Sequence, residues 1–286
     1  MEFPEVKRSI YERGGTLSLD YDYRKDEKVD FSQGLNELGA VVSLLDKIPL
    51  SEMSLVKLMN RTDVKYIVNV NDVPTLMRRA AKEYLIQEID GNCIAKYDTI
   101  YLDTNDLLFF RTHINGKLNR FKWRIRTYIE SNLSFLEVKN KSKTDRTQKS
   151  RIVIGKTDSL KLDPAASFII NTSCTDPNLL VKVLQNNFNR LTMVNRDKTE
   201  RLTIDYNISF KNRLNGKTAH FPNLCIIEIK QERFSESYVK QYLNELRIKK
   251  AGISKYCLGI AMTGDNVKGN LYKQKIRYIQ KIINTK

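Results

Sequence analysis

Hydrophobic and charged residues alternate along residues 120–128, Arg-Phe-Lys-Trp-Arg-Ile-Arg-Thr-Tyr. Successive side chains of a β-strand point to opposite faces, so a strand here has one apolar face, with Phe121, Trp123 and Ile125. The other face carries four cations: Arg120, Lys122, Arg124 and Arg126. Like charges in a row repel one another, and a bound polyanion would stabilise them. The ordinary alternative is a half-buried strand with a solvated basic face.

The same alternation recurs in four further segments, at residues 63–66, 136–141, 201–205 and 227–230. This recurrence favours a more specific interpretation. Several of them place a carboxylate beside cations on the charged face, as Glu137 stands beside Lys139. The outer surface of a sheet could carry this pattern. A closed barrel with a charged interior explains it better, because acids and bases then converge on one site. We therefore expect an α+β fold built on an eight-stranded antiparallel β-barrel with flanking helices.

The remaining pattern predicts the order of the elements. Residues 1–49 are polar and mixed in charge, which indicates a partly disordered extension with one short helix; residues 50–286 form the predicted domain. Ser131-Asn132 separates two long strand segments, 117–130 and 133–142, which should pair as a hairpin. Strands are expected near 64–70, 93–102, 117–130, 133–142, 147–155, 188–195, 200–210 and 223–231. Helices are expected near 52–60, 73–88, 177–186, 235–248, 254–263 and 268–284.

Composition narrows the class of partner. The 286 residues include 49 Lys and Arg against 33 Asp and Glu, so the net charge is +16 and favours an anionic partner. Only two histidines occur, far apart, and the four cysteines form no CxxC pair, which argues against a zinc site or a histidine-based triad. Neither a signal peptide nor an apolar run of ~20 residues is present. The expected location is cytoplasmic, or peripheral at the inner face of a membrane.

An ordered series of motifs adds a family resemblance. It comprises Arg-Thr-Asp-Val-Lys-Tyr (61–66), Tyr-Asp-Thr (97–99), the run from 113 to 128, Leu-Glu-Val-Lys (136–139), Lys-Ser-Arg (149–151), Glu-Arg-Leu-Thr-Ile-Asp (200–205), Cys-Ile-Ile-Glu-Ile-Lys (225–230) and Ser-Lys-Tyr-Cys (254–257). In this order the set resembles the VTC-domain (vacuolar transporter chaperone type) polyphosphate polymerase family of the triphosphate tunnel metalloenzyme superfamily. The resemblance covers about residues 50–265.

The resemblance implies a tunnel with a basic interior open at both ends. It implies an ATP-dependent polyphosphate polymerase, which transfers the γ-phosphate of ATP to a growing polyphosphate chain with Mn²⁺ or Mg²⁺. Two alternatives would use the same interior. One is a tunnel triphosphatase that hydrolyses nucleoside triphosphate or tripolyphosphate. The other is a non-catalytic module that binds polyphosphate or inositol phosphates. Because eukaryotic relatives work beside membrane-embedded subunits, a membrane-embedded partner protein is also expected.

The motifs carry over specific site residues. The implied catalytic residues are Lys65, Arg124, Arg126, Lys139, Arg190 and Arg201. The implied phosphate- or nucleotide-binding residues are Arg120, Lys122, Lys149, Arg151, Lys230, Ser254 and Lys255. Glu228 and Glu137 are the implied metal ligands, and Glu137 has the alternative role of neutralising the interior. Arg196 competes with Arg190 for the same motif position.

Two departures from the family pattern bear on function. The Glu-x-Glu-x-Lys of the superfamily's first strand is replaced by Arg61, Asp63 and Lys65, which resembles the polymerase branch more than the hydrolytic branch. A cation expected two positions before Ser254 is absent. Nucleic acid is not an expected partner, because base stacking needs aromatic side chains on the cationic face and Trp123 falls on the other.

Overall fold

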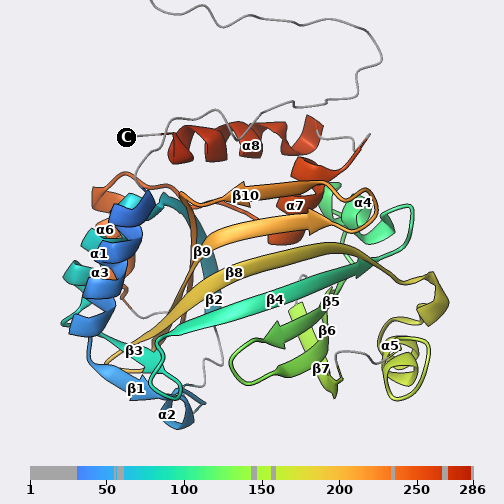
Figure 1. Ribbon diagram of the computed structural model, residues 1–286, viewed down its shortest axis with the longest axis horizontal. Helices are drawn as coiled ribbons and strands as arrows, with labels where there is room; N and C mark the ends of the chain where they lie inside the picture. Colours follow the sequence, from blue (N-terminus) through green and yellow to red (C-terminus); the bar gives the residue numbers. More distant parts are fainter. Residues whose placement is uncertain are drawn as a thin grey trace, which may run out of the picture.

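A curved antiparallel sheet forms the centre of the computed structural model, which describes residues 31–54, 56, 61–142, 147–155, 159–232, 236–265 and 270–284 (Figure 1). Residues 1–30, most of the predicted extension, lie outside the described residues. The sheet order is β2 (Arg61–Asn69), β11 (Leu224–Glu232), β9 (Glu200–Asn212), β8 (Val181–Asn195), β4 (Ile94–Asp103), β5 (Arg120–Tyr128), β6 (Leu133–Lys141) and β7 (Thr147–Ile154). Three short strands extend it: β1 (Lys47–Pro49), β3 (Tyr84–Glu88) and β10 (Thr218–Phe221).

The predicted fold class is confirmed: helices flank an antiparallel path of eight strands. The path is not closed by hydrogen bonds, since β2 pairs with β11, β7 pairs with β6, and among the described residues no ladder joins β2 to β7. The charge of Lys65 on β2 helps lower the pKa of Lys139 on β6, after burial, so these two strands lie close enough for their inner charges to interact.

Two predicted helices are wrong in part. The helix expected at 73–88 ends early, as α3 (Val73–Ala80), and the chain returns as β3 with Tyr84 and Ile86 buried. The helix expected at 177–186 is only a 3-10 turn, η2 (Pro177–Leu179), because β8 begins at Val181 and pairs with β4. A second 3-10 turn, η1 (Val70–Asp72), precedes α3. In both cases strand pairing overrides helix propensity.

Three groups of helices cover the sheet (Figure 1). Helices α1 (Phe31–Leu44), α3 and α6 (Tyr238–Glu245) pack on the outer faces of β2, β9 and β11. Helix α2 (Leu50–Ser54) follows β1, and α5 (Ala165–Ser173) covers the outer face of β5 and β6. Although α1 precedes residue 50, its Leu38 and Val41 are buried in the shared core. The boundary between residues 49 and 50 stays a prediction.

The third group comprises α4 (Leu108–Ile114), α7 (Lys255–Thr263) and α8 (Asn270–Ile283). Asp103, fully buried at the end of β4, holds two of these helices in place. Its carboxylate accepts the backbone N–H groups of Phe109 and Phe110, each at 2.8 Å, and the hydroxyl of Tyr256. Three groups of α4 and α7 are thus fixed relative to β4.

One half of the interior is apolar because β9 changes face at Asn207. Asn207 has a φ of 51°, and the β8–β9 register shifts there. Before the shift Asp205 faces inward, and after it Phe210 faces inward and packs with Leu184 and α7. A Cβ on Gly259 would lie 2.5 Å from Leu184 and 2.6 Å from Phe210, so α7 touches the sheet closely. The interior is therefore packed with apolar side chains along this part of β8 and β9. Openings at both ends of the interior stay a prediction.

Within the described residues, no helix is both long and apolar enough to cross a bilayer.

Candidate functional site

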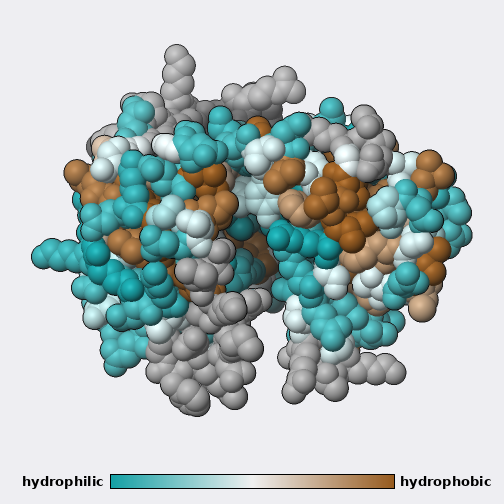
Figure 2. All heavy atoms as spheres, turned by 90° about the horizontal axis from the view of Figure 1, so that it is seen from below, coloured by the Kyte–Doolittle hydropathy of each residue, from teal (hydrophilic) through white to brown (hydrophobic). Residues whose placement is uncertain are grey.

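The inner face of β5 carries the cations that its alternation predicts. On the outer face, Trp123 has no exposed surface, and its ring meets Phe168 of α5 edge-on at 5.7 Å between centroids. The inner residues lie between the two lobes of the molecule, where Figure 2 shows a hollow lined by hydrophilic side chains. Three carboxylates stand among the cations of this hollow, each on a different strand.

Glu137 of β6 is enclosed by cations. Its carboxylate accepts the Nε of Arg124 at 2.7 Å and lies 2.8 Å from the Nζ of Lys149. Burial alone would raise the pKa of Glu137, but Arg124, Arg126 and Lys149 outweigh burial and hold this pKa at about 2. The side chain of Glu137 is 1% exposed, so the surrounding cations leave little room for solvent around its carboxylate.

Asp205 of β9 joins the sheet to α7. Arg190 donates to both carboxylate oxygens, at 2.5 and 2.8 Å, and Lys255 contacts the second oxygen. Burial opposes ionisation, but the two cations keep the pKa of Asp205 well below its usual range. The guanidinium of Arg190 also lies 5.1 Å from the ring centroid of Tyr97 and 5.4 Å from that of Phe188. Charge and ring contacts fix this arginine in the interior.

Glu228 of β11 is the most accessible of the three carboxylates. It lies 2.9 Å from Lys65 and 3.5 Å from Lys230, and its side chain is 17% exposed. Burial would raise the pKa of Glu228, but Lys230 and Lys65 lower it strongly, so the group is ionised. An ionised, partly accessible carboxylate can exchange a lysine for another cation.

Arg126 is a buried cation that forms no direct ion pair with a carboxylate among the described residues, although the charge of Glu137 acts on it. It is 8% exposed, its Nε makes no hydrogen bond, and its guanidinium stands 5.2 Å from the ring centroid of Tyr97. Burial, followed by the neighbouring Arg124 and Arg190, lowers the pKa of Arg126. A buried guanidinium among like charges is costly unless an anion neutralises it. This position is therefore suited to a phosphate group.

The N-terminus of α7 points into the same region. Ser254 caps the helix by accepting the N–H of Cys257, and Lys122 of β5 donates to the Ser254 hydroxyl at 2.9 Å. The cation that the motif lacks before Ser254 is thus supplied by β5. Backbone N–H groups at a helix N-terminus attract anions, and here two lysines, Lys122 and Lys255, stand beside them.

The other predicted residues divide into two groups. Arg151 lies 4.5 Å from the ring centroid of Phe135 at the edge of the hollow, and Lys139 is exposed there. Arg201 instead donates to backbone carbonyls of residues 53 and 56, at 2.9 and 3.4 Å, and so ties down the segment before β2. Arg196 lies outside, paired with Asp46, whereas Arg190 lies inside.

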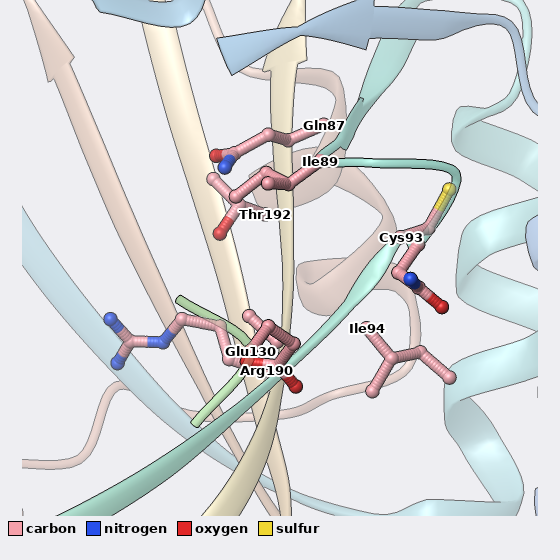
Figure 3. Close-up of a pocket in the computed structure, with 9 residues that line it drawn as sticks. Gln87, Ile89, Cys93, Ile94, Glu130, Arg190 and Thr192 are labelled. Carbon is pink, nitrogen blue, oxygen red and sulfur yellow. The ribbon is translucent and has the colours of Figure 1, made fainter. Parts of the chain in front are cut away.

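The sequence reasoning missed the aromatic floor of the site. Tyr97 and Phe188 stack in parallel with centroids 5.0 Å apart, beneath Arg126 and Arg190. A signal was present, because Phe188 shares the strand parity of Arg190. Arg190 also borders a small cavity of about 20 Å³ between β3, β4 and β8, and its guanidinium extends away from Cys93 and Ile94 on the opposite wall (Figure 3).

The carboxylates do not form a metal cage on their own. Among the described residues, no group of three or more His, Cys, Asp or Glu side chains gathers. Mg²⁺-type sites at phosphates often use only one or two carboxylates, with substrate oxygens as further ligands. Glu228 fits this arrangement, being ionised and partly accessible, while Glu137 is enclosed by Arg124 and Lys149.

Comparisons with known proteins show which proteins this chain resembles. The VTC domain profile matches residues 60–263. An adenylate cyclase-like protein of Vibrio parahaemolyticus shares 14% identity over 71% of this chain and 99% of its own, with a TM-score of 0.40. A Hippeastrum protein described as an adenylyl cyclase with a dominant triphosphatase activity shares 14% identity over 72% and 97%, with a TM-score of 0.45. No curated protein matches the sequence.

Proposed function

This chain belongs to the VTC-domain family, and from that premise we propose that it is a polyphosphate polymerase. It would transfer the γ-phosphate of ATP to the end of a polyphosphate chain in the charged hollow. The observation that carries the proposal is Arg126, a buried guanidinium that forms no direct ion pair with a carboxylate among the described residues and is flanked by Arg124 and Arg190. Phosphoryl transfer needs positioning and charge neutralisation more than covalent help, and this arrangement supplies both.

The cations around Glu137, Asp205 and Glu228 would have different roles in the reaction. Arg126, with Arg124 and Lys149 behind it, would hold the phosphate that is transferred. Arg190 and Lys255 would hold the neighbouring phosphate, with Asp205 fixing their positions. Arginine binds two phosphate oxygens in a planar fork, whereas lysine acts as a point charge. The acceptor is the terminal phosphate of the chain, which is already ionised, so no side chain has to remove a proton.

A divalent ion fits beside Glu228. Glu228 would hold Mn²⁺ or Mg²⁺ together with phosphate oxygens of the substrate, displacing Lys65 or Lys230 from the carboxylate. When bound, such an ion supplies charge neutralisation and polarises the phosphoryl group. Glu137 serves in this proposal as the charge partner of Arg124.

Hydrolysis is the second candidate, since a triphosphatase would use the same cations. Attack by water requires a group that takes up its proton. Glu137 and Asp205 are held ionised by two cations each, and this makes them weak bases. The state of these carboxylates favours a phosphate acceptor over water. A membrane-embedded partner stays a prediction.

The test is to incubate the purified full-length protein with ATP and Mn²⁺ or Mg²⁺ and to separate the products. We expect long, acid-labile phosphate polymer. Orthophosphate without polymer would assign hydrolysis. Binding of ATP or polyphosphate without turnover would assign a binding module, and the absence of both binding and turnover would overturn all three assignments.

A further inference from the structure

Three lysines stand directly opposite one another on the last three strands of the sheet. Lys122 of β5 faces Lys139 of β6, which faces Lys149 of β7. Like charges in direct cross-strand register destabilise a sheet. Two residues further along β5, Arg124 lies in register with Glu137, which in turn lies in register with Arg151. The carboxylate of Glu137 therefore compensates the charges of these two arginines. The lysine line has no carboxylate in register, although Lys149 reaches back to Glu137.

The cations continue from this line to α8. The hydroxyl of Tyr272 contacts the backbone N–H and carbonyl of Ser254, at 3.3 and 3.4 Å. The Nζ of Lys275 lies 5.1 Å from the ring centroid of Tyr272. Because Lys122 donates to the hydroxyl of the same Ser254, Lys122 and Lys275 approach this residue from different elements.

The pKa of His113 on α4 reflects the cations that surround it. Burial, and then the charges of Lys122, Arg120, Lys275 and Lys139, lower the pKa of His113 to about 3. The imidazole is therefore neutral at pH 7 and adds no charge of its own. Within the described part of the chain, none of these four cations forms an ion pair with a carboxylate; Arg120 donates instead to the carbonyl of Lys117 at 2.8 Å.

The position of this cluster suits a polymer that continues beyond the transfer site. Helix α7 and its apolar contacts fill the interior along β8 and β9. The cluster lies beside that plug, between the start of β5 and α8, next to the charged hollow. Figure 1 shows α4, α7 and α8 gathered on one side of the sheet. A chain bound at Arg124 could thus pass along the lysine line without crossing the apolar half.

We propose that Arg120, Lys122, Lys139 and Lys275 form a second anion-binding subsite, the outer port, which holds the phosphates of an inorganic polyphosphate chain beyond those held at the transfer site. This inference rests on the proposed function for the identity of its ligand. Lys122 lies four residues from Arg126 along β5, about 13 Å at 3.3 Å per residue, so a triphosphate bound at Arg126 does not extend to the outer port. The outer port therefore raises the affinity for long chains and leaves the affinity for tripolyphosphate unchanged.

The experiment compares two charge reversals on α8 of the full-length protein. In Lys275→Glu, a port cation becomes an anion. The matched control is Lys273→Glu, an exposed lysine that points about 200° away around the same helix at 3.6 residues per turn. The dissociation constants of tripolyphosphate and of long-chain polyphosphate are measured for both variants, and circular dichroism confirms their folding.

We expect Lys275→Glu to weaken the binding of long-chain polyphosphate about tenfold, as expected for the loss of one charge-assisted contact. Its affinity for tripolyphosphate should stay within about twofold of the wild type, and Lys273→Glu should change neither constant by more. Equal losses in the two variants, or no loss in Lys275→Glu, would overturn the outer port. Wild-type protein that binds neither ligand would overturn the proposed function instead.

Discussion

The two faces of β5 contribute to different properties of the protein. Its outer face buries Trp123 and Ile125 against α5, with contacts that favour folding. Its inner face holds Arg126 beside Arg124 and Arg190, and this contact between buried like charges opposes folding until an anion binds. Successive residues of one strand thus serve stability and function separately, so substitutions on the two faces should have separable effects.

The largest effect is expected on the outer face, from Trp123→Ala. Removal of this fully buried ring should lower the free energy of unfolding by about 3–5 kcal/mol. Urea unfolding followed by circular dichroism measures the loss. Activity should fall only as far as the folded fraction falls. A stable variant that no longer binds nucleotide would show that the two faces are assigned the wrong way round.

The next effect concerns the inner face. Arg126→Ala should abolish polymer synthesis and weaken tripolyphosphate binding by about 1.5–3 kcal/mol, the value of a charge-assisted hydrogen bond. Its unfolding free energy should change little, because the relief of repulsion from Arg124 and Arg190 offsets the lost attraction to Glu137. Arg196→Ala, on an arginine outside the hollow, is the control for both measurements. Wild-type turnover in a well-folded Arg126→Ala protein would rule out this arginine as a phosphate ligand.

A smaller change in binding is expected for Glu228→Gln. The substitution keeps the shape and removes one negative charge from a cationic hollow, so affinity for tripolyphosphate should hold or rise slightly. Polymer synthesis should no longer respond to Mn²⁺, as measured by titrating the metal against activity. An unchanged metal response would move the metal site to Glu137 or Asp205.

The smallest effect is a change in acid stability. The folded-state pKa of Glu137 is about 2 against 4.5 for the ordinary group, so its ion pairs stabilise the fold fully above pH 4.5. That contribution is lost as the pH falls from 4.5 towards 2. In Glu137→Gln, unfolding free energy should fall less steeply across this window, by up to about 1.4 kcal/mol per pH unit. Unfolding curves at several pH values measure the slopes, and parallel slopes would show that Glu137 is not held ionised.

Part of this arrangement could be predicted from the sequence. Alternation assigned Trp123 outward and Arg124 inward, because a period of two fixes faces within a regular strand. The same rule fails along β9, where the irregular residue Asn207 moves Phe210 to the face of Asp205. The apolar half of the interior therefore had no signal in the pattern.

Contacts between segments that are distant in the sequence also could not be predicted from the alternation of residues. Lys275 comes near Lys122 only because α8 packs across the start of α7 through Tyr272. The gap between β2 and β7 likewise depends on how far the sheet curls, which no local spacing encodes. The motif residues were found because each stands on a regular strand beside a recognisable neighbour.

The irregularity at Asn207 also sets the length of the charged part of the interior. It marks the depth at which the interior changes from ion binding to packing, since residues before it present charge and those after it present apolar surface. Strands rise about 3.3 Å per residue, so moving the irregularity by two residues would lengthen or shorten the charged section by about 6.6 Å. The length of the charged section is thus set by one backbone position and can be changed without altering any cation.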